Sequence, residues 1–340
     1  MPPATVVVTG AAGFIGSHVV ERLLQRGDAV LGLDNFDPFY APEEKRRNLE
    51  TALALAGRGA RFQLVEVDVA DALRLRDALA SRAIDAVIHL AAKAGVRASI
   101  LDPAGYARAN VLGTQSVLTE GERRGVRRIV FASSSSVYGN GAVVPFREDA
   151  VATEPVSPYA ATKRAGELLC YAHQHLYRGS VLCLRLFTVY GPRQRPDLAV
   201  RKFATLMSAG KKVPLFGTGS SERDYTWIDD VVDGIVAALD RSARLPQEFE
   251  IVNIGGNRPT SLRRLVELLS EALGVRPVIE QLPPQPGDVE RTWADSSKAR
   301  RLLGYVPTTT IEDGIARFVD WFATTGSGRP APSVPPSSAS

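Results

Sequence analysis

The fold is decided by Thr5-Val-Val-Val-Thr-Gly-Ala-Ala-Gly-Phe-Ile-Gly16, in which a β-branched run leads directly into a glycine-rich turn. The run at Thr5–Thr9 is short and apolar, as buried parallel strands are. The residues from Gly13 to Arg26 have the apolar spacing of a helix. A strand, a glycine turn and a helix in this order form the first half of a βαβ unit.

The glycines of this turn indicate a dinucleotide site. They permit a tight bend and a close approach of a pyrophosphate, while the helix amino terminus offers partial positive charge and free N–H groups. Glycine turns also occur for packing alone, but Asp34 ends the next predicted strand, 18 residues after Gly16. A carboxylate there accepts both ribose hydroxyls and repels a 2′-phosphate, so we expect NAD rather than NADP as the cofactor. The predicted contacts from this region are Gly10, Gly13, Phe14, Ile15, Gly16, Asp34 and Asn35.

Strand-like and helix-like segments alternate through the first half of the chain. The segments expected to be strands are Thr5–Thr9, Ala29–Asp34, Arg61–Asp68, Ala86–Leu90 and Arg128–Ala132. The segments with helical spacing are Gly13–Arg26, Asp71–Ser81 and Ala104–Arg124, and a later helix, Ser157–Tyr177, precedes a strand at Val181–Phe187. This alternation predicts an α/β fold with a doubly wound parallel sheet, the Rossmann architecture.

After Tyr190-Gly-Pro192 the elements become shorter and loops more frequent. We expect a smaller α/β substrate domain that is interleaved with the first, because Trp227–Asp240 and Glu248–Asn253 again resemble a helix and a strand of the main sheet. The predicted division gives residues 1–188 and about 226–255 to the cofactor domain, and residues 189–225 and about 256–325 to the substrate domain. The Pro- and Ser-rich residues 326–340 cannot bury a core, so we expect them to be disordered.

The composition excludes several classes of protein. The 340 residues carry a formal charge of +4, and the basic residues are scattered, so we expect an anionic small molecule rather than nucleic acid as the partner. No run approaches the roughly 18 apolar residues of a membrane span. The start lacks the pattern of a signal peptide, and two cysteines, Cys170 and Cys183, fit a reducing compartment. We therefore expect a cytoplasmic location, with no membrane partner and no metal.

Residues that follow the later strands are also expected near the cofactor, because ligands of open parallel sheets bind outside the carboxyl ends of the strands. Asp68, at the end of the third strand, can bond the adenine amino group, or it can be the N-cap of the next helix. Ala91-Ala-Lys93 follows the fourth strand. The predicted contacts in this group are Asp68, Val69, Ala91, Lys93 and Asn110.

A serine run and a Tyr-x-x-x-Lys pair are the candidate catalytic groups. Ser133-Ser-Ser-Ser136 follows the fifth strand, and Tyr159 and Lys163 lie on one face of the next helix. A tyrosine with a pKa near 10 is a poor base at neutral pH, and lowering that pKa by about three units requires stabilising the phenolate by roughly 4 kcal/mol. The Lys163 ammonium and the positive nicotinamide ring can provide this stabilisation.

With the glycine turn, the serine run and this pair in order, the chain resembles the extended short-chain dehydrogenase/reductase family, over about Thr5–Phe322. The resemblance implies that Tyr159 is the base, which Lys163 tunes while it positions the nicotinamide ribose. It also implies that Ser134 bonds the substrate hydroxyl, an assignment that depends on its distance from Val137-Tyr-Gly139. Ser135 and Ser136 are expected beside the substrate.

Within that family the chain looks like the nucleotide-sugar epimerases, nearest to the UDP-glucuronate 4-epimerases. The resembling stretches are Asp34–Tyr40, Lys93–Arg97, Ser133–Gly139 and Arg185–Ala199. Thr188 stands where many relatives that act on neutral sugars have Asn. Arg195 resembles the arginine that holds the sugar carboxylate in uronate enzymes; alternatively, it caps a loop before a helix.

The resemblance implies further substrate contacts. Arg223 and Arg291 match positions that contact the diphosphate, although each can instead be a surface ion-pair partner. Phe216 either lines the uracil pocket or belongs to the core. Arg97 is the remaining predicted substrate contact.

The expected reaction is a 4-epimerisation of UDP-glucuronate to UDP-galacturonate. Tyr159 takes the proton of the 4-hydroxyl while hydride passes to NAD⁺, the keto sugar swings about its phosphate linkage, and hydride returns to the other face. The alternatives are a UDP-glucose 4-epimerase or a UDP-glucuronate decarboxylase on the same fold and, more remotely, a non-catalytic NAD-binding protein. Resemblance also implies a homodimer through Ala104–Arg124 and Ser157–Tyr177.

Overall fold

A computed structural model describes residues 3–283 and 290–325. At its centre lies a seven-stranded sheet in which every neighbouring pair is parallel. Its strand order is β10 (Phe249–Ile254), β6 (Ser180–Leu186), β5 (Arg128–Ser134), β4 (Ala86–His89), β1 (Thr5–Thr9), β2 (Ala29–Asp34) and β3 (Phe62–Glu66). The predicted doubly wound Rossmann fold is confirmed.

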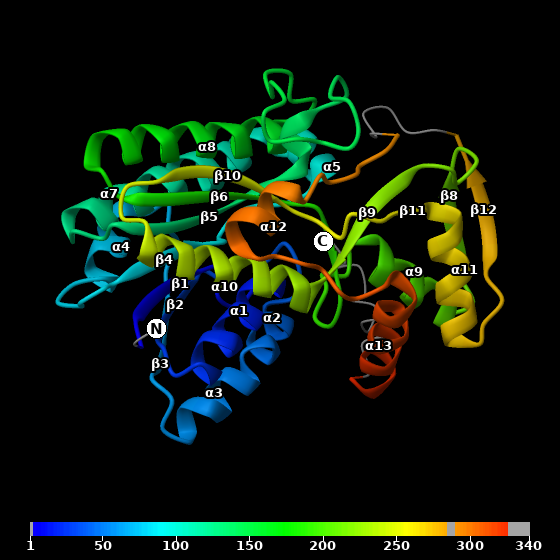
Figure 1. Cartoon of the computed structure of the whole chain (residues 1–340). Coiled ribbons are helices and arrows are strands. Elements are labelled where there is room, and N and C mark those ends of the chain that lie inside the picture. The colour runs from blue at the N-terminus through cyan, green and yellow to red at the C-terminus, as the bar shows by residue number, and fades with distance from the viewer. Residues whose placement is uncertain (1–2, 284–289, 326–340) are drawn as a thin grey trace, which may run out of the picture.

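Helices cover both faces of this sheet, because successive residues of a buried strand point to opposite faces. Val6 and Val8 of β1 pack in one core with residues of α1 and α10, whereas Val7 packs in another with residues of α4 and α7. Figure 1 shows α1 and α10 on one side of the sheet and α7 and α8 on the other. The bounds are α1 (Phe14–Gln25), α2 (Pro42–Asn48), α3 (Glu50–Gly57), α4 (Ala72–Ala78), α7 (Gly113–Arg123), α8 (Pro158–Tyr177) and α10 (Ile228–Arg244).

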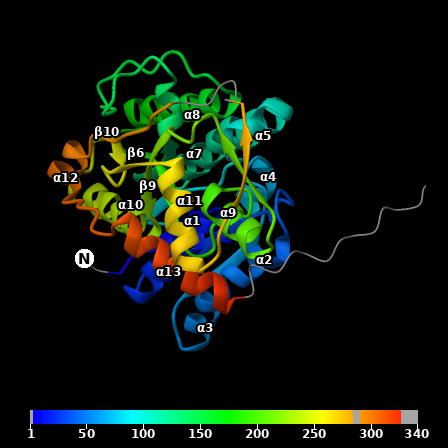
Figure 2. The same ribbon diagram turned by 90° about the vertical axis from the view of Figure 1, so that its right-hand side faces the viewer.

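Two smaller sheets lie beyond the carboxyl ends of the main strands. One contains β7 (Thr188–Tyr190), β9 (Glu222–Trp227) and β11 (Pro259–Ser261), and the other pairs β8 (Lys212–Phe216) with β12 (Val278–Leu282). The helices of this region, seen toward the viewer in Figure 2, are α9 (Ala199–Ser208), α11 (Leu262–Leu273) and α13 (Ile311–Thr324). The chain leaves this region to form α10 and β10, and α12 (Ser297–Leu303) packs against both. The division into two domains stays a prediction.

The predicted helix Ala104–Arg124 is wrong in one respect, because it is not continuous. Asp102 caps a short helix, α6 (Pro103–Ala107), which follows α5 (Val96–Leu101). A π-helical turn at Arg108–Leu112 then leads into α7. Single π turns inside helices often mark functional sites, and this turn carries the buried Asn110.

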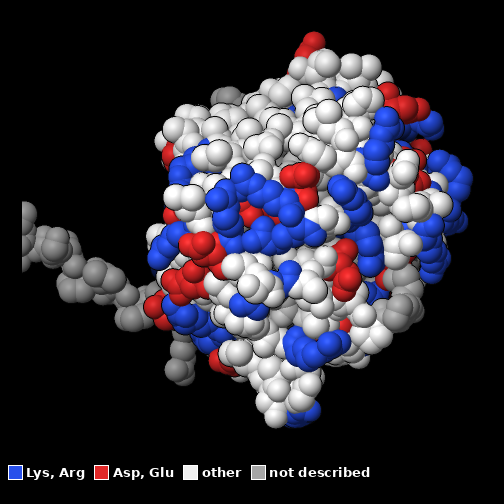
Figure 3. All heavy atoms as spheres, turned by 90° about the vertical axis from the view of Figure 1, so that its left-hand side faces the viewer, with Lys and Arg blue, Asp and Glu red and all other residues white. Residues whose placement is uncertain are grey.

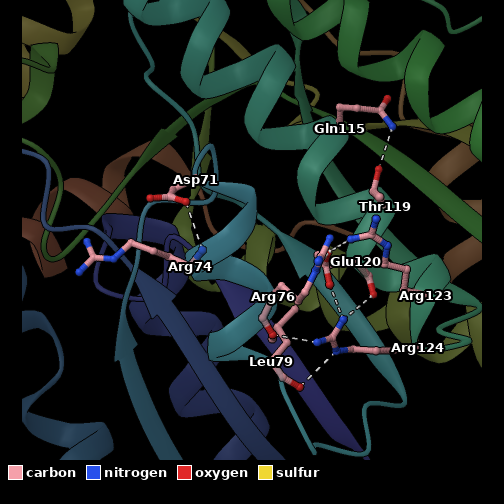
Figure 4. Close-up of polar contacts among 9 residues, drawn as sticks. All are labelled: Asp71, Arg74, Arg76, Leu79, Gln115, Thr119, Glu120, Arg123 and Arg124. Carbon is pink, nitrogen blue, oxygen red and sulfur yellow. Dashed lines mark hydrogen bonds and ion pairs between the residues drawn. The ribbon is translucent and has the colours of Figure 1, made fainter.

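At the amino ends of the strands, a charged cluster joins α4 to α7. The side chain of Glu120 is only 1% exposed and accepts hydrogen bonds from Arg76, Arg123 and Arg124. Arg124 also donates to the carbonyl oxygens of Arg76 and Leu79 at the end of α4 (Figure 4). Seen from this end of the molecule in Figure 3, basic side chains surround acidic ones. The cluster therefore fixes two helix ends.

Two further expectations concern a membrane span and the end of the chain. No helix among the described residues is long and apolar enough to cross a membrane. The disorder expected for residues 326–340 lies outside the described residues.

Candidate active site

One cavity of about 480 Å³ opens at the carboxyl ends of the main strands. It is bordered by residues from the glycine turn, the ends of β2, β4 and β5, the start of α8 and the segment after β6. The predicted site residues that line it are Gly10, Gly13, Phe14, Ile15, Gly16, Asp34, Asn35, Asp68, Val69, Ala91, Lys93, Ser134, Ser135, Ser136, Tyr159, Lys163, Thr188 and Arg195. The structure thus brings together segments that are far apart in the sequence.

The glycine turn has no room for side chains. Gly10 has a φ of +69°, and a Cβ there would lie 2.8 Å from the backbone nitrogen of Ala91. A Cβ on Gly16 would lie 2.0 Å from the carbonyl oxygen of Gly10. The amino end of α1, whose N-cap is Gly13, therefore opens directly onto the cavity, and the first N–H groups of a helix have no partner within it.

Asp34 anchors the turn to the end of β2. Its carboxylate oxygens accept hydrogen bonds from the backbone of Ala12 at 3.0 Å and Phe36 at 2.8 Å. Burial raises the pKa of Asp34, whereas the charge of nearby Lys45 opposes that shift. The carboxylate is therefore held in one orientation beside the cavity.

Asp68 borders the cavity, and two hydrogen bonds hold its carboxylate in place. One Asp68 oxygen accepts from the backbone of Ala70 and the other from Arg108, at 2.8 and 2.6 Å. The suggested helix N-cap role for Asp68 is wrong, because Asp71 caps α4 by accepting from Arg74. The strand ends at Glu66, so Asp68 lies in the turn that follows it.

Asn110, a predicted cofactor contact, is absent from the residues that line the cavity and instead supports one of them. Its side-chain amide pairs with the backbone of Lys93, accepting from N at 2.8 Å and donating to O at 2.9 Å. It also donates to the Thr162 hydroxyl on α8. The buried amide therefore positions the Lys93 backbone against α8.

Adjacent serines on β5 have different partners. Ser133 donates to Glu167 at 2.6 Å, and Glu167 is bonded bidentately by the buried Arg185. Ser134 instead hydrogen-bonds Tyr159 and accepts from the backbone of Ser136. Of these two, Ser134 is the one that contacts the tyrosine, and its hydroxyl also hydrogen-bonds Ser136 Oγ at 3.2 Å.

Tyr159 and Lys163 both contact residues of β5. Lys163 donates to the carbonyl oxygen of Ala132 at 2.7 Å, and burial lowers the pKa of Lys163 to about 8. Burial raises the pKa of Tyr159, while the hydrogen bond from Ser134 and the charge of Arg195 oppose that shift. The protein alone therefore keeps the phenol protonated at neutral pH, and deprotonation requires additional positive charge.

Arg195 enters the cavity from the segment between β7 and α9. Its guanidinium donates to both oxygens of Asp197 and to the carbonyl oxygen of Ala94, and it lies 4.9 Å from the ring centre of Phe39. The side chain is 14% exposed. A cation is thus placed in the same cavity as Tyr159 and Ser134.

The comparisons with known proteins agree with this geometry. The NAD dependent epimerase/dehydratase family matches residues 6–255. The chain belongs to this family. A UDP-glucuronate 4-epimerase of Thermodesulfobacterium geofontis is 40% identical over 316 residues, which cover 93% of this chain and 95% of that one.

Two solved structures of the family have closely similar folds. The UDP-glucuronic acid 4-epimerase of Bacillus cereus, in complex with UDP-glucuronic acid and NAD, has a TM-score of 0.84 at 37% identity and covers 94% of this chain and 99% of that one. The UDP-glucose 4-epimerase of Thermotoga maritima, with UDP-glucose, has a TM-score of 0.84 at 33% identity with the same coverage. Both uronate and neutral-sugar enzymes therefore share this architecture.

NAD, the cofactor of this family, fits the residues present. The glycine turn and the amino end of α1 border the cavity, and Asp34 stands at the end of β2. The hydroxyl oxygen of Tyr40 is buried without a hydrogen-bond partner among the described residues, so a bound polar group can supply one.

The cavity residues that were not predicted from the sequence include Phe39, Tyr40 and Lys45. Lys45 is buried and lies 4.9 Å from the ring centre of Tyr40, and burial lowers its pKa. The stretch Asp34–Tyr40 was selected only because it resembles the UDP-glucuronate 4-epimerases. Nothing in the local sequence pattern distinguishes Lys45 from its exposed neighbours Arg46 and Arg47.

Four predicted substrate contacts do not line this cavity: Arg97, Phe216, Arg223 and Arg291. They form two groups instead. The guanidinium of Arg97 lies 5.1 Å from the ring centre of Phe216. Arg291 pairs with the Glu222 side chain, and Arg223 donates to the Glu222 carbonyl oxygen.

Proposed function

We propose that this chain is an NAD-dependent UDP-sugar 4-epimerase that interconverts UDP-glucuronate and UDP-galacturonate. The observation that carries the uronate assignment is Arg195, a mostly buried cation in the same cavity as Tyr159 and Ser134. The UDP-glucuronate epimerases among its relatives support the same assignment.

Tyr159 is the proposed base. It accepts the proton of the sugar 4-hydroxyl. Ser134 donates a hydrogen bond to the oxygen of that sugar hydroxyl and keeps it aligned. Bound NAD supplies the hydride acceptor and the positive ring that the protein lacks at this place. Lys163, whose ammonium is held by Ala132, adds charge beneath the tyrosine and bonds the nicotinamide ribose. This arrangement overcomes the raised pKa that burial imposes on Tyr159.

Arg195 gives the site a reason to prefer a uronate. Oxidation at C4 produces a ketone β to the carboxylate, and such acids lose carbon dioxide when the carboxylate stands perpendicular to the carbonyl. A planar guanidinium that holds the carboxylate fixes its plane, which a lysine cannot do. Arg195 therefore both binds the charged sugar and protects the intermediate.

The nucleotide half of the substrate requires a second set of residues. Arg223 and Arg291 flank Glu222 and are proposed to bind the diphosphate, while Phe216, covered by Arg97, is proposed to border the uracil. Thr188, which lines the cavity at the start of β7, is proposed to face the sugar.

The rival activities use the same fold. A neutral-sugar epimerase has no need for Arg195, and a decarboxylase must let the carboxylate rotate. A non-catalytic NAD-binding protein has no need for the aligned Ser134, Tyr159 and Lys163. Because a UDP-glucose 4-epimerase is among the similar structures, the neutral-sugar alternative has to be tested by experiment.

Incubation of the purified protein with UDP-glucuronate, without added cofactor, tests the proposal. We expect UDP-galacturonate, found by sugar analysis after acid hydrolysis, and NAD⁺ released from the denatured protein. A pentose product indicates a decarboxylase, and conversion of UDP-glucose but not UDP-glucuronate indicates a neutral-sugar enzyme. Either result contradicts the proposed substrate.

We also propose a homodimer through α8 and the helices beside it. Leu168, Tyr171 and Leu176 of α8 are each more than half exposed, as is Leu101 at the end of α5. Large apolar side chains gathered on adjacent helices favour self-association. Light scattering of the purified protein measures its mass, and a mass equal to one chain contradicts the proposal.

A further inference from the structure

Asp197 occupies the edge of the Arg195 guanidinium that a substrate carboxylate would use. Nε and Nη2 of Arg195 donate to the two Asp197 oxygens at 2.9 and 2.6 Å, and Nη2 also donates to Ala94 O at 3.0 Å. Among the described residues, Nη1 has no acceptor. While Asp197 stays in place, one nitrogen is left for a ligand, so a second parallel hydrogen bond to a carboxylate is excluded.

The two partners differ in their access to water. The Arg195 side chain is 14% exposed, whereas that of Asp197 is 40% exposed. A buried cation without a counter-ion is costly, but a carboxylate that is already 40% exposed loses little when it turns to solvent. Two carboxylates on one guanidinium would also repel each other. The favourable arrangement is one carboxylate on Arg195 at a time.

We propose that Asp197 is an exchangeable counter-ion that sets substrate specificity: it neutralises Arg195 in the free enzyme, and the uronate carboxylate of the substrate displaces it. This proposal rests on the proposed function. It assigns Asp197 no contact with the reacting atoms. Asp197 is a competitor for Arg195, and the strength of its pair determines how tightly a uronate binds relative to a neutral sugar.

The chain contains a matched pair outside the cavity. Arg147 and Asp149 have the same Arg-x-Asp spacing and the same bidentate contact, at 3.1 and 3.0 Å, but their side chains are 62% and 69% exposed. The variants Asp197→Asn and Asp149→Asn therefore remove the same charge from the same local geometry, once beside a cavity arginine and once beside an exposed one.

Calorimetric binding to the NAD-loaded enzyme tests the exchange, with Tyr159→Phe in every variant so that the sugar is not converted. Asp197→Asn is expected to lower the Kd of UDP-glucuronate about two- to tenfold and to leave that of UDP-glucose unchanged. Asp149→Asn is expected to change neither. With Tyr159 restored, Asp197→Asn is expected to lower KM for UDP-glucuronate at unchanged kcat.

A double-mutant cycle identifies Arg195 as the group for which Asp197 competes. In an Arg195→Ala background, Asp197→Asn is expected to have no effect on uronate binding. Equal losses for both sugars in Arg195→Ala would overturn the uronate assignment and the exchange with it. A uronate-specific loss in Arg195→Ala, combined with unchanged or weaker uronate binding in Asp197→Asn, would overturn the exchange alone, because Asp197 would then orient Arg195 instead of competing for it.

Discussion

Two polar clusters join the end of β5 to α8; we call the one around Glu167 the lower cluster and the one around Tyr159 the upper cluster. The lower cluster contains Ser133, Glu167 and Arg185, with Glu167 and Arg185 at most 1% exposed. The upper cluster contains Ser134 and Tyr159, which face the cavity. Ser133 and Ser134 are neighbours in the sequence, yet the alternation of a strand sends them to different clusters.

The difference lies in how completely each cluster is bonded by the protein itself. Glu167 accepts hydrogen bonds from Ser133, Arg164 and Arg185. In the upper cluster, burial raises the pKa of Tyr159, and Ser134 and the charge of Arg195 oppose this shift without cancelling it. In the lower cluster both carboxylate oxygens of Glu167 are bonded within the protein, so we expect this cluster to hold the fold, whereas we expect the upper one to be completed by a ligand.

The largest expected effect is in the upper cluster. Tyr159→Phe removes one hydroxyl without changing the bulk of the side chain, and loss of a general base commonly costs about 10²–10⁴-fold in rate. We expect kcat to fall by that amount while the thermal midpoint and the bound NAD stay unchanged. Initial rates of epimerisation and a thermal unfolding scan measure both, and near-normal turnover would place the base elsewhere.

The opposite pattern is expected in the lower cluster. Glu167→Gln leaves the buried Arg185 without its counter-ion, and breaking a buried pair costs about 3–5 kcal/mol of unfolding free energy. Urea unfolding measures this loss, with the exposed Glu50→Gln as a control that should change little. A loss below about 1 kcal/mol would mean that the lower cluster does not hold the fold.

The stability lost in Glu167→Gln should depend on pH. Burial raises the pKa of Glu167, but the hydrogen bonds and charge of Arg185 outweigh burial and bring this pKa below its ordinary value of 4.5. Because the folded pKa is the lower one, the contribution is present above pH 4.5 and is lost as pH falls through the folded value. Urea midpoints of wild type and variant should therefore converge in acid; a difference independent of pH would show that ionisation of Glu167 is not its source.

The third expected effect concerns Arg195. If it holds the uronate, Arg195→Ala should lose about 2–5 kcal/mol toward UDP-glucuronate and much less toward UDP-glucose. Some turnovers should also release carbon dioxide and a 4-keto pentose, because the carboxylate can then rotate. Arg195→Lys keeps the charge without the planar fork and should lie between wild type and Ala. Values of kcat/KM for both sugars decide, and parallel losses would favour an arginine that merely caps its loop.

Local sequence patterns predicted the sheet and the centre of the cavity because both depend on short-range rules. The glycine turn and Asp34 follow from backbone sterics and strand length, and Tyr159 and Lys163 share a helix face by their spacing. Each of these residues lines the cavity.

Contacts between distant segments could not be predicted in this way. Lys45 reaches the cavity because α2 is fixed at both ends, by Asn48 donating to Ala12 O at 3.0 Å and by Glu44 pairing with Arg201 on α9. Asn110 was predicted to contact the cofactor; the structure adds that it lies in a π turn and that its amide pairs with the Lys93 backbone. Which of two adjacent serines faces Tyr159 likewise requires the strand register.

The smallest expected effect separates those serines directly. Ser134→Ala removes a hydrogen bond to the oxygen that becomes charged, and such bonds contribute about 1.5–3 kcal/mol, so kcat should fall roughly 10- to 100-fold at unchanged stability. Ser133→Ala removes a donor from Glu167 instead, and it should cost about 1 kcal/mol of unfolding free energy while kcat stays near wild type. The crossed pattern is the decisive feature, because both substitutions delete the same hydroxyl from neighbouring positions of β5. If Ser133→Ala lost the activity and Ser134→Ala the stability, the roles of the two clusters would be exchanged.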